Sequence, residues 1–141
     1  MKVMLDKDAK MPTRAHPFDA GLDIYAPEGT CVYGIRPCGG SVTIDTGVHM
    51  QIPEGYVGFI KAKSGLNVKH GLTCTGVIDA HYTGSIAVKL YNHHPCLRYD
   101  VKPGDKIAQL VVLKCELPEL ELVDSLEETD RGDDGFGSTG R

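Results

Sequence analysis

The sequence predicts an all-β fold, a jelly-roll-like barrel or sandwich with one short helix near residues 64–70 and a flexible C-terminal arm. Short runs of strand-forming residues recur between Gly and Pro residues along the chain, and this pattern is typical of β-sandwiches and barrels. Within 85–90, Ile86, Val88 and Leu90 alternate with a small and a charged residue, as a half-buried strand requires. A chain of 141 residues fits one such domain.

Each expected element has its own sequence signal. The strands are expected at 22–25, 30–35, 41–44, 48–52, 56–62, 86–91 and 106–113. The last of them is apolar nearly throughout, which predicts a strand buried on both faces. The helix should have Ser64 as its N-cap, continue through 66–70 and stop at Gly71. A hydroxyl side chain caps helix N-termini, and glycine adopts the left-handed conformation that ends a helix.

Composition and charge exclude several classes of function. The hydrophobic content of 41% and charged content of 24% are ordinary for a soluble globular protein. The net charge of −4 speaks against stable nucleic-acid binding, which needs clustered positive charge. No run reaches the ~18 consecutive apolar residues that cross a bilayer, so no membrane association is expected. The first twelve residues lack the apolar core of a secretory signal.

The cysteines indicate the redox compartment. There are 5 of them, an odd number with no C-x-x-C pair, which favours reduced thiols over a disulfide framework or a zinc site. Free cysteines usually behave as small buried hydrophobes, so we expect all of them in the core. The sequence therefore predicts a cytoplasmic protein, or one of the nucleus or host cytoplasm if its source is eukaryotic or viral.

Two regions carry groups suited to a metal or a phosphate. Asp19 and Asp23 flank a turn of small residues, and such carboxylates can hold Mg²⁺ directly or through its waters. An acidic β-turn is a commoner explanation of the same pattern. Lys63 and Ser64 stand where the short helix begins, and the N–H groups and dipole of a helix start favour an anion. Ordinary N-capping by Ser64 would also explain these residues.

Two further places could act on a ligand. Asp79 follows the apolar pair Val77 and Ile78, so it could be partly desolvated and serve as a general base. Tyr82 offers a flat face for a sugar or a ring. A hairpin with an Asx turn at Asp79 and a core-packed Tyr82 would give the same pattern. Gln109 interrupts an apolar run and must bond either core backbone or a ligand.

The C-terminal segment is the most distinctive part of the chain. The sequence becomes acidic and then, over 131–141, rich in glycine, with Arg131 and the single aromatic residue Phe136. Such a segment is mobile when free, and it could be either a disordered tail or a lid for an aromatic, phosphorylated ligand. We expect a β domain at 1–124 and an acidic linker with a closing arm at 125–141.

Taken in order, these segments resemble one family. The resemblance is carried by Asp-Ala-Gly-Leu-Asp-Ile-Tyr-Ala at 19–26, Ala-Lys-Ser-Gly-Leu at 62–66, Gly-Val-Ile-Asp-Ala-His-Tyr-Thr-Gly at 76–84, Gly-Asp-Lys-Ile-Ala-Gln-Leu at 104–110 and Arg-Gly-Asp-Asp-Gly-Phe-Gly-Ser-Thr-Gly at 131–140. These are similar to the five ordered motifs of the trimeric deoxyuridine triphosphatases (dUTPases). Five motifs in this order are far more specific than any one of them.

The resemblance implies a jelly-roll homotrimer whose active sites are shared between subunits and closed by the C-terminal arm. It implies hydrolysis of dUTP to dUMP and pyrophosphate with Mg²⁺ on the triphosphate, which limits uracil incorporation into DNA and supplies dUMP for thymidylate synthesis. By the motif match, Asp79 would activate the attacking water, Asp23 would contact the metal through water and Tyr82 would pack under the deoxyribose. The other implied substrate-binding residues are Lys63, Ser64, Gly65, Gly76, Val77, Ile78, Gln109, Arg131, Phe136, Gly137, Ser138 and Thr139.

The chain departs from the family's motifs in several places. Lys63 stands where the family usually has arginine, so a two-pronged contact with phosphate is lost, and Asp134 replaces a usual glycine in the arm. Lys106, Ser85 and His81 are milder departures.

Two alternative functions also remain open. The first is that of the related dCTP deaminases, which share the fold, although Lys89 occupies the position of their functional glutamate. The second alternative is a dUTPase-like trimer kept as a binding or regulatory module.

Overall fold

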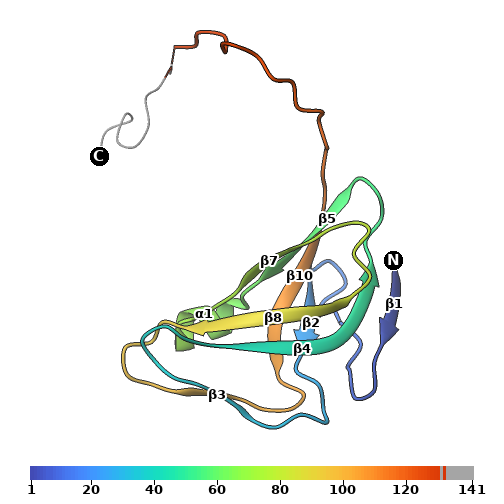
Figure 1. Ribbon diagram of the computed structural model, residues 1–141. Coiled ribbons are helices and arrows are strands. Elements are labelled where there is room, and N and C mark those ends of the chain that lie inside the picture. Colours follow the sequence, from blue (N-terminus) through green and yellow to red (C-terminus); the bar gives the residue numbers. More distant parts are fainter. Residues whose placement is uncertain (131, 133–141) are drawn as a thin grey trace.

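Antiparallel β-sheet forms the body of the protein in the computed structural model, which describes residues 1–130 and Gly132 (Figure 1). One four-stranded sheet has the order β1-β4-β8-β6 and the other the order β2-β10-β5-β7, while β3 and β9 pair separately. The elements are β1 (Lys2–Leu5), β2 (Gly21–Tyr25), β3 (Tyr33–Ile35), β4 (Gly40–Gln51), β5 (Tyr56–Lys61), α1 (Ser64–His70), β6 (Leu72–Thr73), β7 (Thr75–Ile78), β8 (Ser85–Asn92), β9 (Tyr99–Val101) and β10 (Lys106–Lys114). The predicted all-β class with one short helix is confirmed.

The hydrophobic core contains side chains from both four-stranded sheets. Ile86, Val88 and Leu90 of β8 are all buried, as their alternation predicts, and they share one cluster with Ile60 of β5 and Leu110 of β10. Each fully buried side chain of this size contributes about 1.5–3 kcal/mol relative to exposure. This core fixes the two sheets and thereby the positions of the polar residues on their strands.

The long strand β4 joins two segments that the sequence predicts separately, at 41–44 and 48–52. Its pairing with β8 shifts register between Asp45 and His49, and Gly47 has a φ of 64° there. The hydroxyl of Thr46 donates to the carbonyl of Ile86 across this irregularity. Hydrogen bonds to β8 therefore keep β4 continuous between the two segments that the sequence predicts separately.

Several short strands are absent from the sequence expectation. They are β1, β6, β7 and β9. Each is at most four residues long, so its apolar pattern is too short to be recognised in the sequence. Pairing with the partner strand determines where each of them forms. The expected strand at 30–35 is correspondingly reduced to β3.

The short helix begins and ends almost as predicted. The N-cap is Lys63 rather than Ser64, which is the first helical residue, and no side chain caps the helix. The expectation of Ser64 as N-cap is therefore wrong by one residue. Gly71 ends the helix in the left-handed conformation, with φ 66°, and its N–H bonds the carbonyl of Asn67.

Two expectations about burial are wrong. In β10, Ile107 and Leu110 are buried, but Leu113 is half exposed in the single chain, because β2 covers only the first part of this strand. Among the cysteines, Cys74 is buried, and burial raises its pKa to about 11. Three others lie in connections between strands and are exposed, namely Cys31, Cys38 and Cys96.

Beyond β10 the chain leaves the domain. Residues 116–130 run away from the sheets as an extended segment (Figure 1). Its leucines are almost fully exposed, namely Leu117, Leu120, Leu122 and Leu126. In the part of the chain that the structure describes, no helix is long and apolar enough to cross a membrane.

Candidate active site

A buried carboxylate with two lysines organises one end of the sheet that contains β2, β10 and β5. Asp23 on β2 lies opposite Gln109 on β10, and Gln109 in turn lies opposite Lys61 on β5. Only 2% of Asp23 is exposed. A buried carboxylate needs compensating partners, and the neighbouring elements supply them.

Asp23 accepts hydrogen bonds on both of its carboxylate oxygens. Lys63 Nζ lies 2.5 Å and Gln109 Nε2 3.2 Å from Oδ1, while Lys106 Nζ lies 2.7 Å from Oδ2. Burial raises the pKa of Asp23, but the hydrogen bonds from Lys106, Lys63 and Gln109 outweigh it and hold that pKa below its usual range. Two ammonium groups against one carboxylate leave a positive charge here, which suits an anionic ligand.

The residues around Asp23 do not fit direct coordination of Mg²⁺. That ion prefers several oxygen ligands in octahedral geometry and keeps part of its water shell, whereas the oxygens of Asp23 already face three nitrogen donors. Asp19 is engaged in a local turn, where its carboxylate accepts from the N–H of His16 at 2.9 Å. Within residues 1–130 and Gly132, no group of three or more His, Cys, Asp or Glu side chains could hold a metal ion.

The start of α1 adds an open surface beside the lysines. Ser64 and Gly65 are exposed, and a Cβ at Gly65 would meet no atom within 4 Å. A ligand therefore has access to the backbone between Lys63 and the first turn of the helix.

Two residues of this cluster were not among the predicted site residues. Lys106 makes the second charged contact with Asp23, and its place in the segment at 104–110 is a signal that could have found it. Gly21 lies against Gln109, where a Cβ would come within 3.0 Å of that side chain. A side chain at position 21 would therefore crowd the amide of Gln109.

The second group of predicted residues lies in the loop after β7, which crosses to β8 in the other four-stranded sheet, so the hairpin considered for this segment is not formed. Asp79 is exposed in the single chain, so the partial desolvation expected from its apolar neighbours is not present there. Its carbonyl accepts from the N–H of Tyr82 at 3.1 Å, which closes the turn. The hydroxyl of Tyr82 donates to the carbonyl of Ser85 at 2.8 Å, and the residue is 45% exposed. Tyr82 is thus available to a ligand and is not packed in the core.

The strand that leads to Asp79 offers unpaired backbone. β7 is an edge strand that pairs only with β5 in its sheet, and an edge strand presents N–H and C=O groups on its free side. Val77 on this strand is 58% exposed. A shallow, largely apolar pocket beside Asp79 is lined by Phe59, Val77 and Leu117, among others.

The single chain does not bring the two groups together. Thr75 lies opposite Lys61, in the same row across the sheet as Gln109 and Asp23. Asp79 follows four residues later along β7, which is roughly 13 Å at the rise of a strand. Lys63, Gln109 and Asp23 therefore lie at one end of the sheet, while Asp79 and Tyr82 lie near the other. The predicted Arg131, Phe136, Gly137, Ser138 and Thr139 lie outside the described residues.

Comparisons with known proteins find similar sequences over nearly the whole chain. The family model described as dUTPase matches residues 7–140. The deoxyuridine 5′-triphosphate nucleotidohydrolase of Rhodococcus erythropolis is 44% identical over 96% of this chain and 82% of its own length. That of Kluyveromyces lactis is 42% identical over 100% of this chain and 94% of its own length.

Two solved phage structures are also similar. A variant of the Staphylococcus bacteriophage 80alpha dUTPase with dUpNHpp has a TM-score of 0.88 and 34% identity, covering 99% of this chain and 98% of its own. A variant of the dUTPase from phage phi11 of S. aureus, whose structure shows a Mg(II) ion, has a TM-score of 0.78 and 32% identity. It covers 90% of this chain and 98% of its own.

Proposed function

Because the chain belongs to the dUTPase family and hydrolyses dUTP to dUMP and pyrophosphate, we propose that Asp79 activates the water that attacks the α-phosphorus. The observation that carries this proposal is the exposed carboxylate of Asp79 beside an apolar pocket and a free strand edge. A carboxylate at this place can accept a proton from water. In-line displacement at phosphorus otherwise depends on positioning and charge neutralisation.

The cluster around Asp23 binds the phosphates in this proposal. Lys63 and Gln109 contact the carboxylate of Asp23. These contacts hold the ammonium of Lys63 and the amide of Gln109 close together, next to the open start of α1. Ser64 and Gly65 complete this surface with backbone N–H groups. Asp23 thereby orients donors, and the lysines neutralise part of the triphosphate charge.

The phosphate oxygens of dUTP, rather than a cage of protein side chains, would hold Mg²⁺ in this site. Both carboxylate oxygens of Asp23 already face nitrogen donors, and one oxygen of Asp19 accepts from the N–H of His16. The phosphate oxygens supply the direct ligands in this proposal. Bound Mg²⁺ would neutralise charge on the phosphates. In this proposal Asp23 would contact the metal through water, with Lys63 or Lys106 turned from its carboxylate to a phosphate.

The active site is shared between subunits of a homotrimer. Lys63 and Asp79 lie at different ends of the same sheet, so one chain alone does not form the site. Another copy of the chain, bringing Asp79 to the Asp23 cluster, would complete it. The exposed leucines of 116–130 support the same assembly, since such apolar side chains are stabilised by burial against a partner.

The nucleoside is recognised by the β7 edge, Tyr82 and the arm. Backbone groups of Gly76, Val77 and Ile78 bond the uracil edge, which rejects cytosine by hydrogen-bond polarity. Tyr82 packs under the deoxyribose and excludes a 2′-hydroxyl. The arm then closes over the substrate with the residues that its motif supplies, namely Arg131 at the phosphates, Phe136 on the uracil, and Gly137, Ser138 and Thr139 beside them.

The cellular setting that we propose is a reducing compartment such as the cytoplasm. Cys31, Cys38 and Cys96 are exposed and unpaired, and thiols in this state persist where reductants are abundant.

Turnover with four nucleotides tests these proposals together. dUTP hydrolysis would be measured with and without Mg²⁺ and compared with dTTP, dCTP and UTP, with both pyrophosphate and ammonia as readouts. We expect pyrophosphate from dUTP alone, and only weak turnover without the metal. Ammonia from dCTP would favour the deaminase alternative, and full turnover of Asp79→Asn would refute the proposed role of Asp79.

A further inference from the structure

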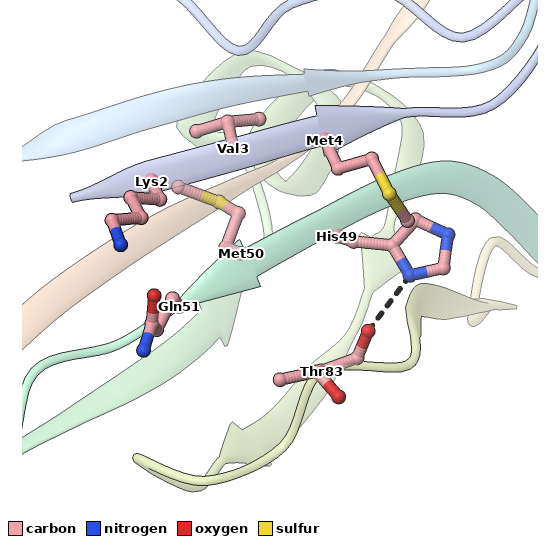
Figure 2. A pocket seen from close by; sticks show the side chains of 7 residues that line it. All are labelled: Lys2, Val3, Met4, His49, Met50, Gln51 and Thr83. Atoms are coloured by element: carbon pink, nitrogen blue, oxygen red, sulfur yellow. Dashed lines mark hydrogen bonds between the residues drawn. The ribbon is translucent and has the colours of Figure 1, made fainter.

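A histidine on β4 ties the loop that carries Asp79 and Tyr82 to the N-terminal part of the domain. Figure 2 shows the His49 ring beside Met4 of β1, with its Nδ1 directed at the carbonyl of Thr83. That contact is 2.8 Å long. On the other side of the ring, Nε2 lies 3.2 Å from Oδ2 of Asp6. The imidazole therefore bridges the segment after β1 and the loop after β7.

The partners of the ring define its protonation. A carbonyl oxygen only accepts hydrogen bonds, so Nδ1 must carry a proton to bond Thr83. The carboxylate of Asp6 also only accepts, so the second bond needs a proton on Nε2 as well. The charged ring makes both bonds. The neutral ring has one N–H, so either tautomer keeps only one of the two bonds and no longer joins Thr83 to Asp6.

The charged groups around the ring favour its charged form. The hydrogen bonds to Thr83 and Asp6 raise the pKa of His49, and the negative charges of Asp6 and Asp45 add to this shift, while burial opposes it. The cation among its neighbours is Lys2 of β1, which lines a surface pocket together with His49. The pKa is raised, so the charged bridge is complete below the usual histidine value of about 6.5. It is lost as the pH rises through the folded-state pKa.

The bridge reaches the loop where other anchors are weak. The hydroxyl of Tyr82 bonds Ser85 within the loop itself. His81 meets Glu54 at 3.6 Å, but both side chains are 85% exposed, and such a pair contributes little. The loop is next held where Ser85 Oγ donates to Asp45. Between Asp79 and Ser85, the hydrogen bond from His49 to the Thr83 carbonyl is thus the contact that ties this loop to β4.

We propose that His49 is a positioning residue, whose protonated ring holds the loop of Asp79 and Tyr82 in the form that binds dUTP. The inference rests on the proposed roles of Asp79 and Tyr82. His49 touches neither substrate nor metal in this proposal. It acts through the Thr83 carbonyl, so its protonation changes KM more than kcat.

The test compares variants of the full chain across pH 5.5–8.5 with Mg²⁺ and dUTP. His49→Gln keeps one neutral donor, and His49→Leu keeps none. We expect the KM of His49→Gln to exceed that of the unaltered protein about two- to tenfold at pH 6, the range of one net hydrogen bond. The two should converge at pH 8.5. His49→Leu should have a raised KM at every pH.

Two further variants control the assignment. Asp6→Asn removes the carboxylate that favours the charged ring, so the pH at which KM rises should move lower. His16→Gln makes the same chemical change at an exposed position and should follow the unaltered protein. A KM ratio for His49→Gln that stays constant across the pH range, with thermal unfolding unchanged, would overturn the proposal.

An NMR titration keeps the inference testable if His49 variants fold poorly. In the unaltered protein, the His49 ring and the amides of 79–85 should titrate together, and Asp6→Asn should lower that midpoint. Amides that ignore the ring titration would refute the bridge. This readout does not depend on turnover, whereas an active Asp79→Asn would refute the proposed catalytic role and leave the bridge standing.

Discussion

Lys63 Nζ lies 2.5 Å from Oδ1 of Asp23, across a separation of 40 residues in the chain. One residue belongs to the buried strand β2 and the other is the N-cap of α1. The contact holds the lysine at the open start of the helix, where a phosphate would bind. It also makes the cation at position 63 the most informative place to alter the site.

Lys63→Arg should raise kcat/KM for dUTP by about two- to fivefold. A guanidinium can contact Asp23 and a phosphate with separate N–H groups and binds oxygen pairs in a planar fork, whereas an ammonium is a point charge. Steady-state kinetics with dUTP and Mg²⁺ would measure the gain, and Lys89→Arg on the exposed face of β8 provides the control. Unchanged kinetics would show that the planar fork of an arginine binds the phosphate no better than the lysine does.

Asp79→Asn should lower kcat by about 10²–10⁴-fold with little change in KM. The amide has nearly the same shape but cannot take a proton from water, and general-base contributions are of this size. Single-turnover kinetics and binding of dUpNHpp would separate chemistry from affinity. Asp100→Asn on β9 is a matched control at a distance from the loop of Asp79, and a comparable loss there would point to a general effect of charge.

Asp23→Asn should destabilise the protein by about 1–3 kcal/mol at pH 7. Breaking a fully buried ion pair costs more, but Lys63 and Lys106 are partly exposed, so water screens their loss. The pKa of Asp23 is lowered in the fold, so its contribution is present above the usual value of about 3.9 and is lost as the pH falls through the folded-state pKa. Urea unfolding across pH 2–7 would measure this.

The free energies of unfolding of the unaltered protein and of Asp23→Asn should therefore become equal at low pH. Protonated aspartic acid and asparagine are both neutral, and the lysines lose their partner in either case. A stability difference that stays constant down to pH 2 would contradict the assigned ion pairs.

Truncation after Asp130 should leave a folded trimer whose kcat/KM falls by at least about 100-fold. The residues removed supply Arg131 and Phe136 of the closing arm, and the loss of a donor that neutralises developing charge has effects of this order. Light scattering would give the assembly state and steady-state kinetics the activity. Loss of the trimer in this variant would assign the arm to assembly instead of closure.

The sequence predicted the elements that depend on residues close together in the chain. It did not predict the elements that depend on contacts between distant segments. The alternation of Ile86, Val88 and Leu90 identified β8, and Gly71 marked the end of α1. By contrast, β7 has only four residues and exists because β5 pairs with it. The same holds for burial at Leu113, which depends on how far β2 extends along β10.

The candidate site divides in the same way. The motifs identified the residue types, including Asp23, Lys63 and Asp79, since these occur in recognisable segments. They did not reveal that Lys63 and Lys106 occupy both oxygens of Asp23, because these contacts join segments far apart in the chain. They also did not reveal the bridge of His49, whose partners Asp6 and Thr83 are 43 and 34 residues away from it in the chain.

The separation of Lys63 from Asp79 along the sheet has a genetic consequence. In the homotrimer that we propose, each active site draws on different chains, so a variant damaged at the Asp23 cluster and another damaged at Asp79 carry complementary defects. Co-expressed in one cell, they would assemble into mixed trimers in which some sites contain two intact halves. Two alleles that are each inactive alone would then restore dUTP hydrolysis together, while two alleles damaged in the same half would not.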